Sequence, residues 1–435
     1  MKLLPGPPRA HASGYYDDHG SSKFVVPPLG GIALSQRACC PIPPKGGTTN
    51  KAVLQTQVPR TIMKYDVAIV GAGIVGLAHA WRAAERGLRV VVLERSKLPS
   101  GASIRNFGMV WPIGQPFDGR HRIAMRSREL WLEVANTADI WVQECGSLHL
   151  AHREDEYAVL QEFCELAKDK ADVSMLTAEE TLKKTDGAYP DGLLGSLWCP
   201  TELCVNPRQA IHQLARHFES HANIDIHFET TVVSVEDGHL QASNGEQWNA
   251  GRTVICGGSD FETLFPTHFR EAGLKKCKLQ MLRTAAQPSE WSLGPHLASG
   301  LTLRHYESFQ ACPTQANLRK RIAEETPELD RFGIHVMAAQ HNAGHIVLGD
   351  SHEYDDEIAP FDQNEIEQLM LRELRRQFSF PTWEVESRWN GTYAKHPTEP
   401  LLRLKPKPDV TICISPGGAG MTLSFGWADE FCASL

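Results

Sequence analysis

The chain has 435 residues, 42% hydrophobic and 22% charged, which is an ordinary globular composition and, at about 100 to 200 residues per domain, predicts two or three domains. With 44 Lys and Arg against 52 Asp and Glu, the formal net charge of -8 provides no basic field for a phosphate backbone and argues against nucleic acid as a partner. Eleven cysteines without a CxxC pair fit neither a disulfide framework nor a zinc site, which indicates a reducing, cytoplasmic compartment. No apolar run reaches about 18 residues, so we expect no transmembrane helix.

Residues 1–62 differ in composition from the rest of the chain. They contain nine Pro and seven Gly, and seven Lys and Arg against two acidic residues, Asp17 and Asp18. Such a segment has little apolar surface to bury, so we expect a disordered basic tail, with a transit peptide as the less favoured alternative. Because Met63 directly precedes the first expected strand, we interpret residues 1–62 as a dispensable arm or a start-site artefact.

A βαβ unit begins the regular part of the chain. The sequence YDVAIV has the apolar run of a short buried strand, and GAGIVG follows it as a glycine turn. LAHAWRAAERG then reads as a helix, and LRVVVLE reads as a second strand that ends at Glu94. Gly71, Gly73 and Gly76, with an acidic residue at the end of the next strand, form a dinucleotide-binding fingerprint in the structural context that it requires.

Each position of this fingerprint has a physical role. Gly71 permits the tight turn, Gly73 lets the backbone approach a pyrophosphate, and Gly76 allows the helix to pack closely on the strand. The N–H groups at the start of the helix then bind the phosphates. Glu94 accepts hydrogen bonds from a ribose 2′-hydroxyl and repels a 2′-phosphate, which argues against NADP.

Further elements follow in chain order. Helical periodicity is expected over residues 118–138 and 155–167, and a third helix is expected to begin at Asn206, whose side chain caps it. A strand, a hairpin with an Asn244-Gly245 turn and the strand RTVICGG come next.

The middle of the chain is expected to be rich in strands. RTAAQP, LTLRHY, GIHVMAAQ and HIVLGD all read as strands, and no long helix is expected before Asp362, which caps one with Glu365 three residues on. The chain closes with a strand, a glycine turn and a helix in DVTICISPGGAGMTLSFGWADEF. After the βαβ unit, only RTVICGG and this last strand are expected to return to the first sheet. The pattern favours FAD over NAD, because a long buried cofactor is contacted by distant segments.

These motifs resemble the D-amino acid oxidase, glycine oxidase and sarcosine oxidase family of FAD enzymes, from residue 64 to the C-terminus. The resemblance rests on GAGIVG with Glu94, GASIRNFGMV, VICGGSDFE and GGAGMTLSFG. It implies an α/β fold with a Rossmann-like FAD-binding domain of the glutathione-reductase type and a second, mixed-sheet α+β substrate domain. The expected FAD-binding domain is discontinuous, over residues 63–150, 200–265 and 395–435, and the substrate domain covers residues 151–199 and 266–394.

The resemblance also implies which residues contact FAD. The segment around Ser103 runs beside the flavin ring, and the C-terminal glycine turn places a helix start at its pyrimidine edge, where the reduced flavin gathers negative charge. The adenine contact is a backbone group of Val232 or Val233. Besides the fingerprint, the residues assigned to FAD are Ser103, Arg105, Asn106, Gly108, Val233, Gly418, Gly420, Met421 and Thr422.

Within the family, the chain is most similar to a bacterial branch associated with breakdown of 2-aminoethylphosphonate and its N-methyl derivatives. The segments that carry this likeness are IRNFGMVWPIGQP, KLQMLRTAAQP, LTLRHYESF, GIHVMAAQH, GDSHEY and RWNGTYAKHP. The implied reaction is hydride transfer from the carbon beside an amine to flavin N5, followed by imine hydrolysis and release of H2O2 as O2 reoxidises the flavin. The alternatives are a glycine, sarcosine or D-amino acid oxidase, and an FAD dehydrogenase that passes electrons to a partner.

The acid end of such a substrate requires cationic or hydrogen-bonding side chains, because a phosphonate carries up to two negative charges. Arg283 and His305 are the first candidates, and Lys395 is the candidate for a cation close to flavin N5, where positive charge favours electron transfer to oxygen. Lys276 and Lys278 are alternatives for that last role. The remaining candidates considered are Arg304, Tyr306 and His396.

We expect no metal site. His352 and Glu353 are adjacent in GDSHEY, but no HExxH or comparable ligand spacing accompanies them. None of the cysteines is assigned to a covalent flavin bond, so non-covalent FAD is assumed.

Overall fold

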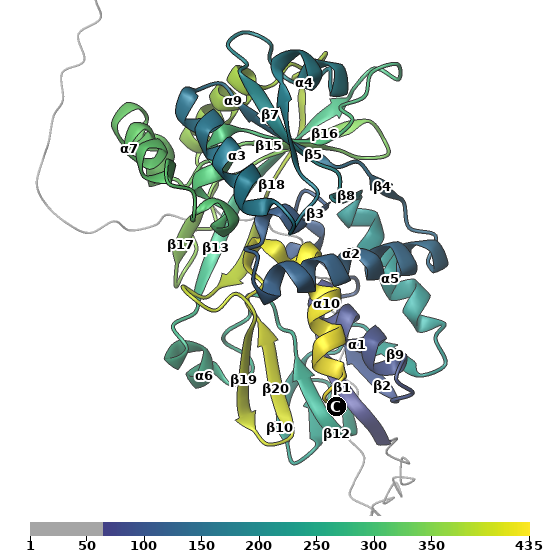
Figure 1. Cartoon of the computed structure of the whole chain (residues 1–435). Helices are drawn as coiled ribbons and strands as arrows, with labels where there is room; N and C mark the ends of the chain where they lie inside the picture. Colours follow the sequence, from purple (N-terminus) through teal and green to yellow (C-terminus); the bar gives the residue numbers. More distant parts are fainter. Residues whose placement is uncertain (1–63) are drawn as a thin grey trace, which may run out of the picture. The chain divides into compact units, whose positions relative to one another are not determined.

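The computed structural model describes residues 64–435, so the expectation of a disordered tail over residues 1–62 lies outside the described residues. Three β-sheets and ten α-helices make up the described part (Figure 1). Within it, no helix combines the length and the apolar character needed to cross a membrane. The helices are α1 (Ile74–Ala84), α2 (Gly119–Thr137), α3 (Glu154–Ala167), α4 (Ala178–Lys184), α5 (Pro207–Glu219), α6 (Pro266–Glu271), α7 (Gln315–Glu325), α8 (Pro327–Arg331), α9 (Asn364–Gln377) and α10 (Gly420–Cys432).

The first sheet is built around β1, which lies parallel between β2 and β12, and β20 is parallel to β12. Val70 is paired with Leu93 on one side and with Ile255 on the other, so three strands end at the same level. This confirms the βαβ unit and the expected return of RTVICGG and the last strand to its sheet. The strands are β1 (Lys64–Val70), β2 (Val90–Leu93), β9 (Ile224–His227), β10 (Val232–Glu236), β11 (His239–Ala242), β12 (Gln247–Ile255), β19 (Leu402–Lys407) and β20 (Val410–Ile414).

Both faces of the first sheet are buried, as its parallel centre requires. Val67 and Ile69 point into a core shared with α1, α2, α5 and α10, whereas Ala68 points into a second core that includes Val232 and Phe269. Figure 1 shows α10, in yellow, beside α1 on this sheet. The alternation of neighbouring residues between two cores explains why β1 reads as a continuous apolar run.

The second sheet is mixed, and its core is shared with α3, α7 and α9. Its β5 crosses the domain boundary that we expected between residues 150 and 151. A small sheet of β3 (Met109–Val110), β4 (Val142–Glu144) and β8 (Leu203–Val205) completes the described part. The strands of the second sheet are β5 (Ser147–Ala151), β6 (Ser174–Thr177), β7 (Gly195–Cys199), β13 (Lys275–Ala286), β14 (His296–Ala298), β15 (Met337–Gln340), β16 (His345–Gly349), β17 (Glu353–Asp355) and β18 (Val385–Lys395).

Two predictions for residues 300–331 are wrong. LTLRHY does not form a strand: Gly300–Arg304 is a short 3-10 helix, η3. Nearby side chains bond to its backbone carbonyls instead of a neighbouring strand. The Thr302 hydroxyl donates to the Ser299 carbonyl at 2.6 Å, and the Arg304 guanidinium donates to the Leu301 carbonyl at 3.0 Å. Helices α7 and α8 also lie in the stretch where no long helix was expected.

Two expected helix caps are absent. Asp362 does not cap α9, because its carboxylate pairs with the buried Lys278 ammonium at 2.9 Å and the cap position is Gln363. Asn206 occupies the cap position of α5, but its side chain makes no capping hydrogen bond and donates to Asn342 instead. A longer-range partner has replaced the local one in both cases.

A charge cluster joins three helices of the first sheet. Asp429, on α10, accepts from Arg82 of α1 and Arg126 of α2, each at 2.9 Å, and from Arg86 at 3.0 Å. Partial burial raises the pKa of Asp429, but hydrogen bonds from Arg126 and Arg86 and the charge of Arg82 outweigh it and lower the pKa to about 2. The ionised carboxylate therefore stabilises the packing of α10 against α1 and α2.

We expect Asp429→Asn to lower the free energy of unfolding by about 1–2 kcal/mol at pH 7, a value reduced for solvent screening. A pKa below that of the unfolded chain stabilises the fold above about pH 4, and this contribution is lost as the pH falls toward 2. Urea unfolding at pH 7 and at about pH 2 measures it. The control is Glu430→Gln, whose partner Arg122 is 72% exposed, for which we expect less than about 0.5 kcal/mol. Equal effects of the two substitutions would contradict this role of Asp429.

Candidate functional site

A cavity of about 510 Å³ opens at the level where β1, β2 and β12 end. It reaches from the glycine turn after β1 to the second sheet, where Leu279 and Met281 of β13 line it. Ligand sites in open α/β sheets lie at this carboxyl edge of the strands. The sequence-predicted residues that line it are Gly71, Gly73, Glu94, Ser103, Arg105, Asn106, His305, Lys395, Gly418, Gly420, Met421 and Thr422.

The glycine turn is shaped by close contacts that exclude side chains. Gly71 has φ +103°, and a Cβ there would lie 2.6 Å from the Cys256 carbonyl oxygen. A Cβ on Gly76 would lie 1.9 Å from the Gly71 carbonyl oxygen, so α1 packs directly on the turn. Gly73 is the residue before α1 and lines the cavity. In the first turn of α1, the Ile74 N–H donates to Ser103 and the Leu77 N–H to the Gly73 carbonyl, whereas the N–H groups of Val75 and Gly76 are available to a phosphate.

Glu94 supports this turn from the end of β2. Its carboxylate accepts from the Ala72 N–H at 2.8 Å and from the Ser96 N–H at 2.9 Å, through different oxygens. The residue is 8% exposed and lines the cavity. Each carboxylate oxygen keeps a lone pair beyond these bonds, so Glu94 can still accept from a ribose hydroxyl.

The segment around the 3-10 helix η1 (Ala102–Ile104) forms another wall. The Ser103 hydroxyl accepts from the Ile74 N–H at 2.9 Å, which attaches this wall to the start of α1. Asn106 donates to the Ala102 and Ser103 carbonyls and accepts from the Gly108 N–H at 2.8 Å, so its side chain holds the loop.

Besides Gly76, two residues assigned to FAD from the sequence do not line the cavity. Gly108 has φ +78°, and a Cβ there would lie 1.9 Å from the Val205 carbonyl oxygen, so glycine is required for packing against β8. Val233 is 46% exposed, whereas Val232 is 3% exposed and lines the cavity. Neighbouring strand residues point to opposite faces, which makes Val232 the residue of β10 available to a ligand.

The start of α10 closes the cavity on the side of the small sheet. The Thr422 hydroxyl accepts from the Trp111 N–H at 2.9 Å, and the Met421 carbonyl accepts from the Trp131 indole at 2.8 Å. These bonds fix the orientation of the helix start, whose positive end faces the cavity through Gly418 and Gly420.

The end of the cavity near α10 and β18 contains one lysine with no ion pair among residues 64–435. Lys395 lines this end, and its Nζ lies 3.8 Å from the position of a Cβ on Gly417. The two alternatives are held elsewhere: Lys276 pairs with Glu262 at 2.6 Å, and Lys278 pairs with Asp362. Lys395 is therefore the lysine that the fold leaves available to a ligand.

Arg283 does not line the cavity. Its guanidinium pairs with Glu386 at 3.0 Å, on the neighbouring strand β18. Arg283 lies on the same face of β13 as Leu279 and Met281, but the cavity ends at Met281, and Arg283 lies one step beyond it. Arg304 is also held, by Asp330 at 2.9 Å.

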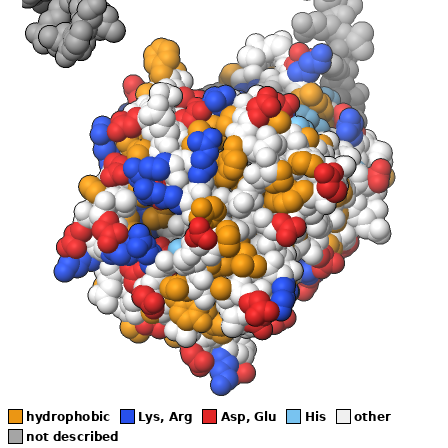
Figure 2. Space-filling view, turned by 90° about the horizontal axis from the view of Figure 1, so that it is seen from above, with side chains coloured by type: hydrophobic (Ala, Val, Ile, Leu, Met, Phe, Trp, Pro, Cys, Tyr) orange, Lys and Arg blue, Asp and Glu red, His pale blue; other side chains and the backbone are white. Residues whose placement is uncertain are grey.

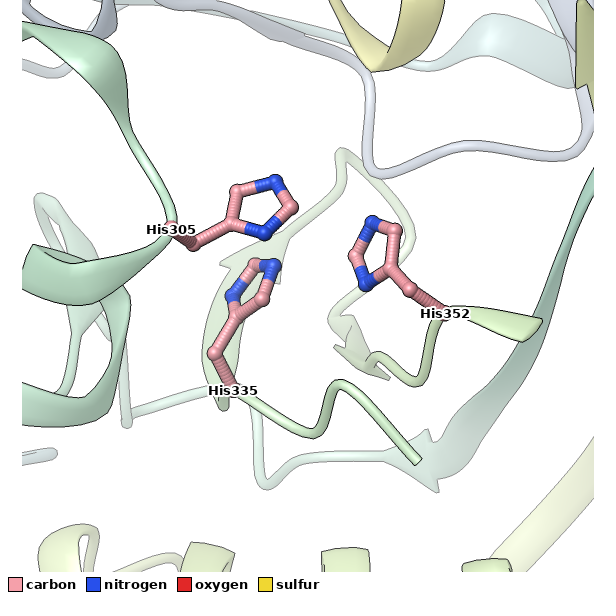
Figure 3. A group of neighbouring side chains, drawn as sticks. All are labelled: His305, His335 and His352. Carbon is pink, nitrogen blue, oxygen red and sulfur yellow. The ribbon is translucent and has the colours of Figure 1, made fainter. Parts of the chain in front are cut away.

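His305 has neighbours that the sequence reading missed. His305, His335 and His352 come from three segments and form one cluster on the cavity wall, and Figure 3 shows their rings converging. Glu353 is not part of it, because its carboxylate accepts from Gln363. Each histidine lies in one of the segments LTLRHYESF, GIHVMAAQH and GDSHEY, so the recurrence of His in these three was the available signal.

Relatives of known function share parts of this chain. An opine oxidase subunit from Rhizobium meliloti is 27% identical over 54% of this chain and 67% of its own length. Glycine oxidase from Geobacillus kaustophilus is 27% identical over 45% of this chain and 55% of its own length. The matches thus span about half to two thirds of these relatives.

Solved structures share the fold over a greater length. Glycine oxidase from Bacillus cereus superposes with a TM-score of 0.68 at 20% identity, over 85% of this chain and 94% of that one. A family model described as DAO, FAD dependent oxidoreductase, matches residues 66–433. The glycine turn, the acid at the end of β2 and the start of α10 at the cavity fit FAD. The chain therefore belongs to the DAO family of FAD-dependent oxidoreductases.

Proposed function

We propose that the protein is an FAD-dependent oxidase of a small amine that carries an acid group, with 2-aminoethylphosphonate or its N-methyl derivative as the leading candidates. The observation that carries the proposal is Lys395, a cation with no ion pair in the described part of the chain, at the end of the cavity beside the start of α10. A cation in such a cavity binds an anionic substrate group through a charge-assisted hydrogen bond.

The chemistry that FAD supplies when bound is the acceptance of a hydride from the carbon beside the amine nitrogen, with O2 as the final acceptor. The net reaction converts the amine, O2 and water to a carbonyl compound, the released amine and H2O2. The protein's own part is to orient the substrate and to exclude solvent, which needs no protein nucleophile. Lys395 fixes the acid end, and Leu279 and Met281 supply an apolar wall.

The assignment of residues to FAD forms part of the proposal. The glycine turn, Glu94, Ser103 and Val232 would hold the nucleotide part, and the positive end of α10 would stabilise the negative charge that a reduced flavin gathers. Asn106 and Gly108 would shape the wall beside the ring: Asn106 holds its loop by hydrogen bonds, and Gly108 packs against β8.

A second candidate substrate is glycine or a related amino acid. Of the two cationic candidates for the acid group, Arg283 is paired outside the cavity and Lys395 remains, and a carboxylate with one negative charge is satisfied by one cation. Two relatives are named as an opine oxidase and a glycine oxidase, which also supports acidic amines as the substrate class.

We expect Glu94→Ala to weaken FAD binding about 10- to 100-fold, because the hydrogen bonds to Ala72 in the turn and to Ser96 after β2 are lost together with the ribose acceptor. Titration of the apoprotein with FAD, followed by quenching of flavin fluorescence, measures the affinity. Glu85→Ala is the control, since Glu85 is at the far end of α1. An unchanged affinity for Glu94→Ala would contradict its assignment.

Peroxide release tests the reaction and its substrate. The FAD-loaded full chain is assayed with N-methyl-2-aminoethylphosphonate, 2-aminoethylphosphonate, glycine, sarcosine and D-alanine. We expect peroxide with the phosphonates. Activity on the carboxylates alone would support the second candidate and reject the phosphonates. Bleaching of the flavin without peroxide would reject an oxidase in favour of a dehydrogenase with another electron acceptor.

We expect Lys395→Met to raise KM for the acidic amine about 10- to 100-fold, because one charge-assisted bond is worth about 1.5–3 kcal/mol. Lys276→Met is the matched control, since Lys276 is at the same end of the second sheet but is paired with Glu262. FAD content and the flavin spectrum verify that both variants are loaded. Equal KM values for wild type and Lys395→Met would show that this lysine does not bind the acid group.

A further inference from the structure

The histidine cluster has a geometry that the proposed oxidation of an amine does not explain. One ring nitrogen from each of His305, His335 and His352 lies within 4.8 Å of the others. The ring centroid of His305 lies 4.1 Å from that of His335 and 4.4 Å from that of His352. These residues are separated in sequence and come from the end of η3, from the chain before β15 and from the loop between β16 and β17.

Polar atoms beside the cluster have no hydrogen bond in the described part of the chain. Both ring nitrogens of His335 and the Oδ1 atom of Asp350 are buried without one, although His335 Nε2 and Asp350 Oδ1 lie 3.2 Å apart. A buried polar group without a partner costs about 1–3 kcal/mol, and several at one place indicate a partner supplied by a ligand.

The hydrogen bonding of the rings indicates a cation as that ligand. His335 is 2% and His352 is 6% exposed, whereas His305 is exposed on the cavity wall. The His352 Nδ1 lies 3.2 Å from the Gly333 carbonyl, to which it can only donate, so Nε2 keeps its lone pair. Neutral imidazoles are metal ligands, whereas an anion site would need them protonated.

We propose that His305, His335 and His352 bind a divalent transition-metal ion, with Zn²⁺ as the best-fitting ion, and that its open coordination position faces the cavity. Three imidazoles suit Zn²⁺, Cu²⁺, Ni²⁺ and Fe²⁺ better than Mg²⁺ or Ca²⁺. Three protein ligands with one position left open is the arrangement of Zn²⁺ sites that bind a further molecule. With Zn–N bonds of about 2.0–2.1 Å, tetrahedral ligand nitrogens lie about 3.3 Å apart, so small side-chain rotations close the site.

Asp350 supports the site from behind. Its side chain is buried, and its Oδ1 atom lies 3.2 Å from His335 Nε2. A carboxylate beside a metal-bound imidazole accepts from its other ring nitrogen and orients the ring. Asp350 is therefore a positioning residue for His335.

The ion also supplies the charge that a phosphonate requires, an extension that rests on the proposed function. Among the described cations that line the cavity, Arg95 and Arg120 are ion-paired, Arg105 lies in the wall assigned to FAD and donates to the Asn390 carbonyl, and Lys395 has no ion pair. Lys395 alone would leave one charge of a dianion uncompensated. An oxygen of the acid group at the open position of the ion would be compensated by both the ion and Lys395.

Equilibrium dialysis of the FAD-loaded full chain against ZnCl2, after treatment with a chelator, tests the site. We expect one Zn²⁺ per chain in the wild type, its loss in His335→Asn and His352→Gln, and affinity about 10- to 100-fold weaker in Asp350→Asn. His149→Gln is the matched control, because His149 is as deeply buried in the second sheet but lies outside the cluster. FAD content and thermal unfolding verify that each variant is folded.

A second measurement uses Co²⁺ in the dithionite-reduced protein, where flavin absorption is weak. We expect the visible bands of tetrahedral Co²⁺ in the wild type and in His149→Gln, and their absence in His352→Gln. The proposal would be overturned if the wild type bound no Zn²⁺, or if the wild type and the cluster variants bound it equally.

The same samples separate this inference from the proposed function. Amine-driven flavin reduction in protein that binds no Zn²⁺ would leave the oxidase standing and overturn the metal site. Zn²⁺ bound at the cluster in protein whose flavin no acidic amine reduces would overturn the proposed function and the role in substrate binding, while the metal site would stand. A KM for the phosphonate that falls when Zn²⁺ is added, in wild type but not in His352→Gln, is the expected result.

Discussion

The close approach of backbone at the end of β1 is the constraint on which the rest of the cavity depends. Gly71 lies against the Cys256 carbonyl, and Gly76 lies against the carbonyl of Gly71. A side chain at either position would separate β1 from β12 or from α1. Because β1, β2 and β12 end in register, such a displacement would also move Glu94 away from the turn that it supports.

The other walls are attached to this centre by single hydrogen bonds over long sequence distances. Ser103 accepts from Ile74 at the start of α1, and Thr422 of α10 accepts from Trp111. Each bond joins a side chain of one wall to a backbone N–H of another, which satisfies a buried donor and orients two elements together. The cavity is therefore rigid where a cofactor is expected. Figure 2 shows acidic and basic side chains interspersed on the face in view.

Sequence patterns predicted the elements whose cause is local. The glycine turn, helices α1 and α2 and the hairpin at Gly245 are each determined by a few neighbouring residues, and the structure contains all of them. The failures have long-range causes. Asp362 has the right position for a cap, but a buried lysine 84 residues earlier in the chain competes for it. Arg283 has the expected strand and face, and only the length of the cavity along β13 excludes it.

The histidine cluster could not be assembled by spacing rules, because its members are separated by a helix pair and a strand hairpin. Its chemistry is nevertheless tied to the other charged group of the cavity. The charged Lys395 lines the same cavity as the three histidines. The same positive charge opposes a bound cation, whereas a substrate anion between the ion and Lys395 attracts both. Binding of the ion and of the acidic substrate would therefore be coupled, and by reciprocity each would strengthen the other. If the ion were bound weakly without substrate and tightly with it, the site would select substrates by their acid group rather than by their amine.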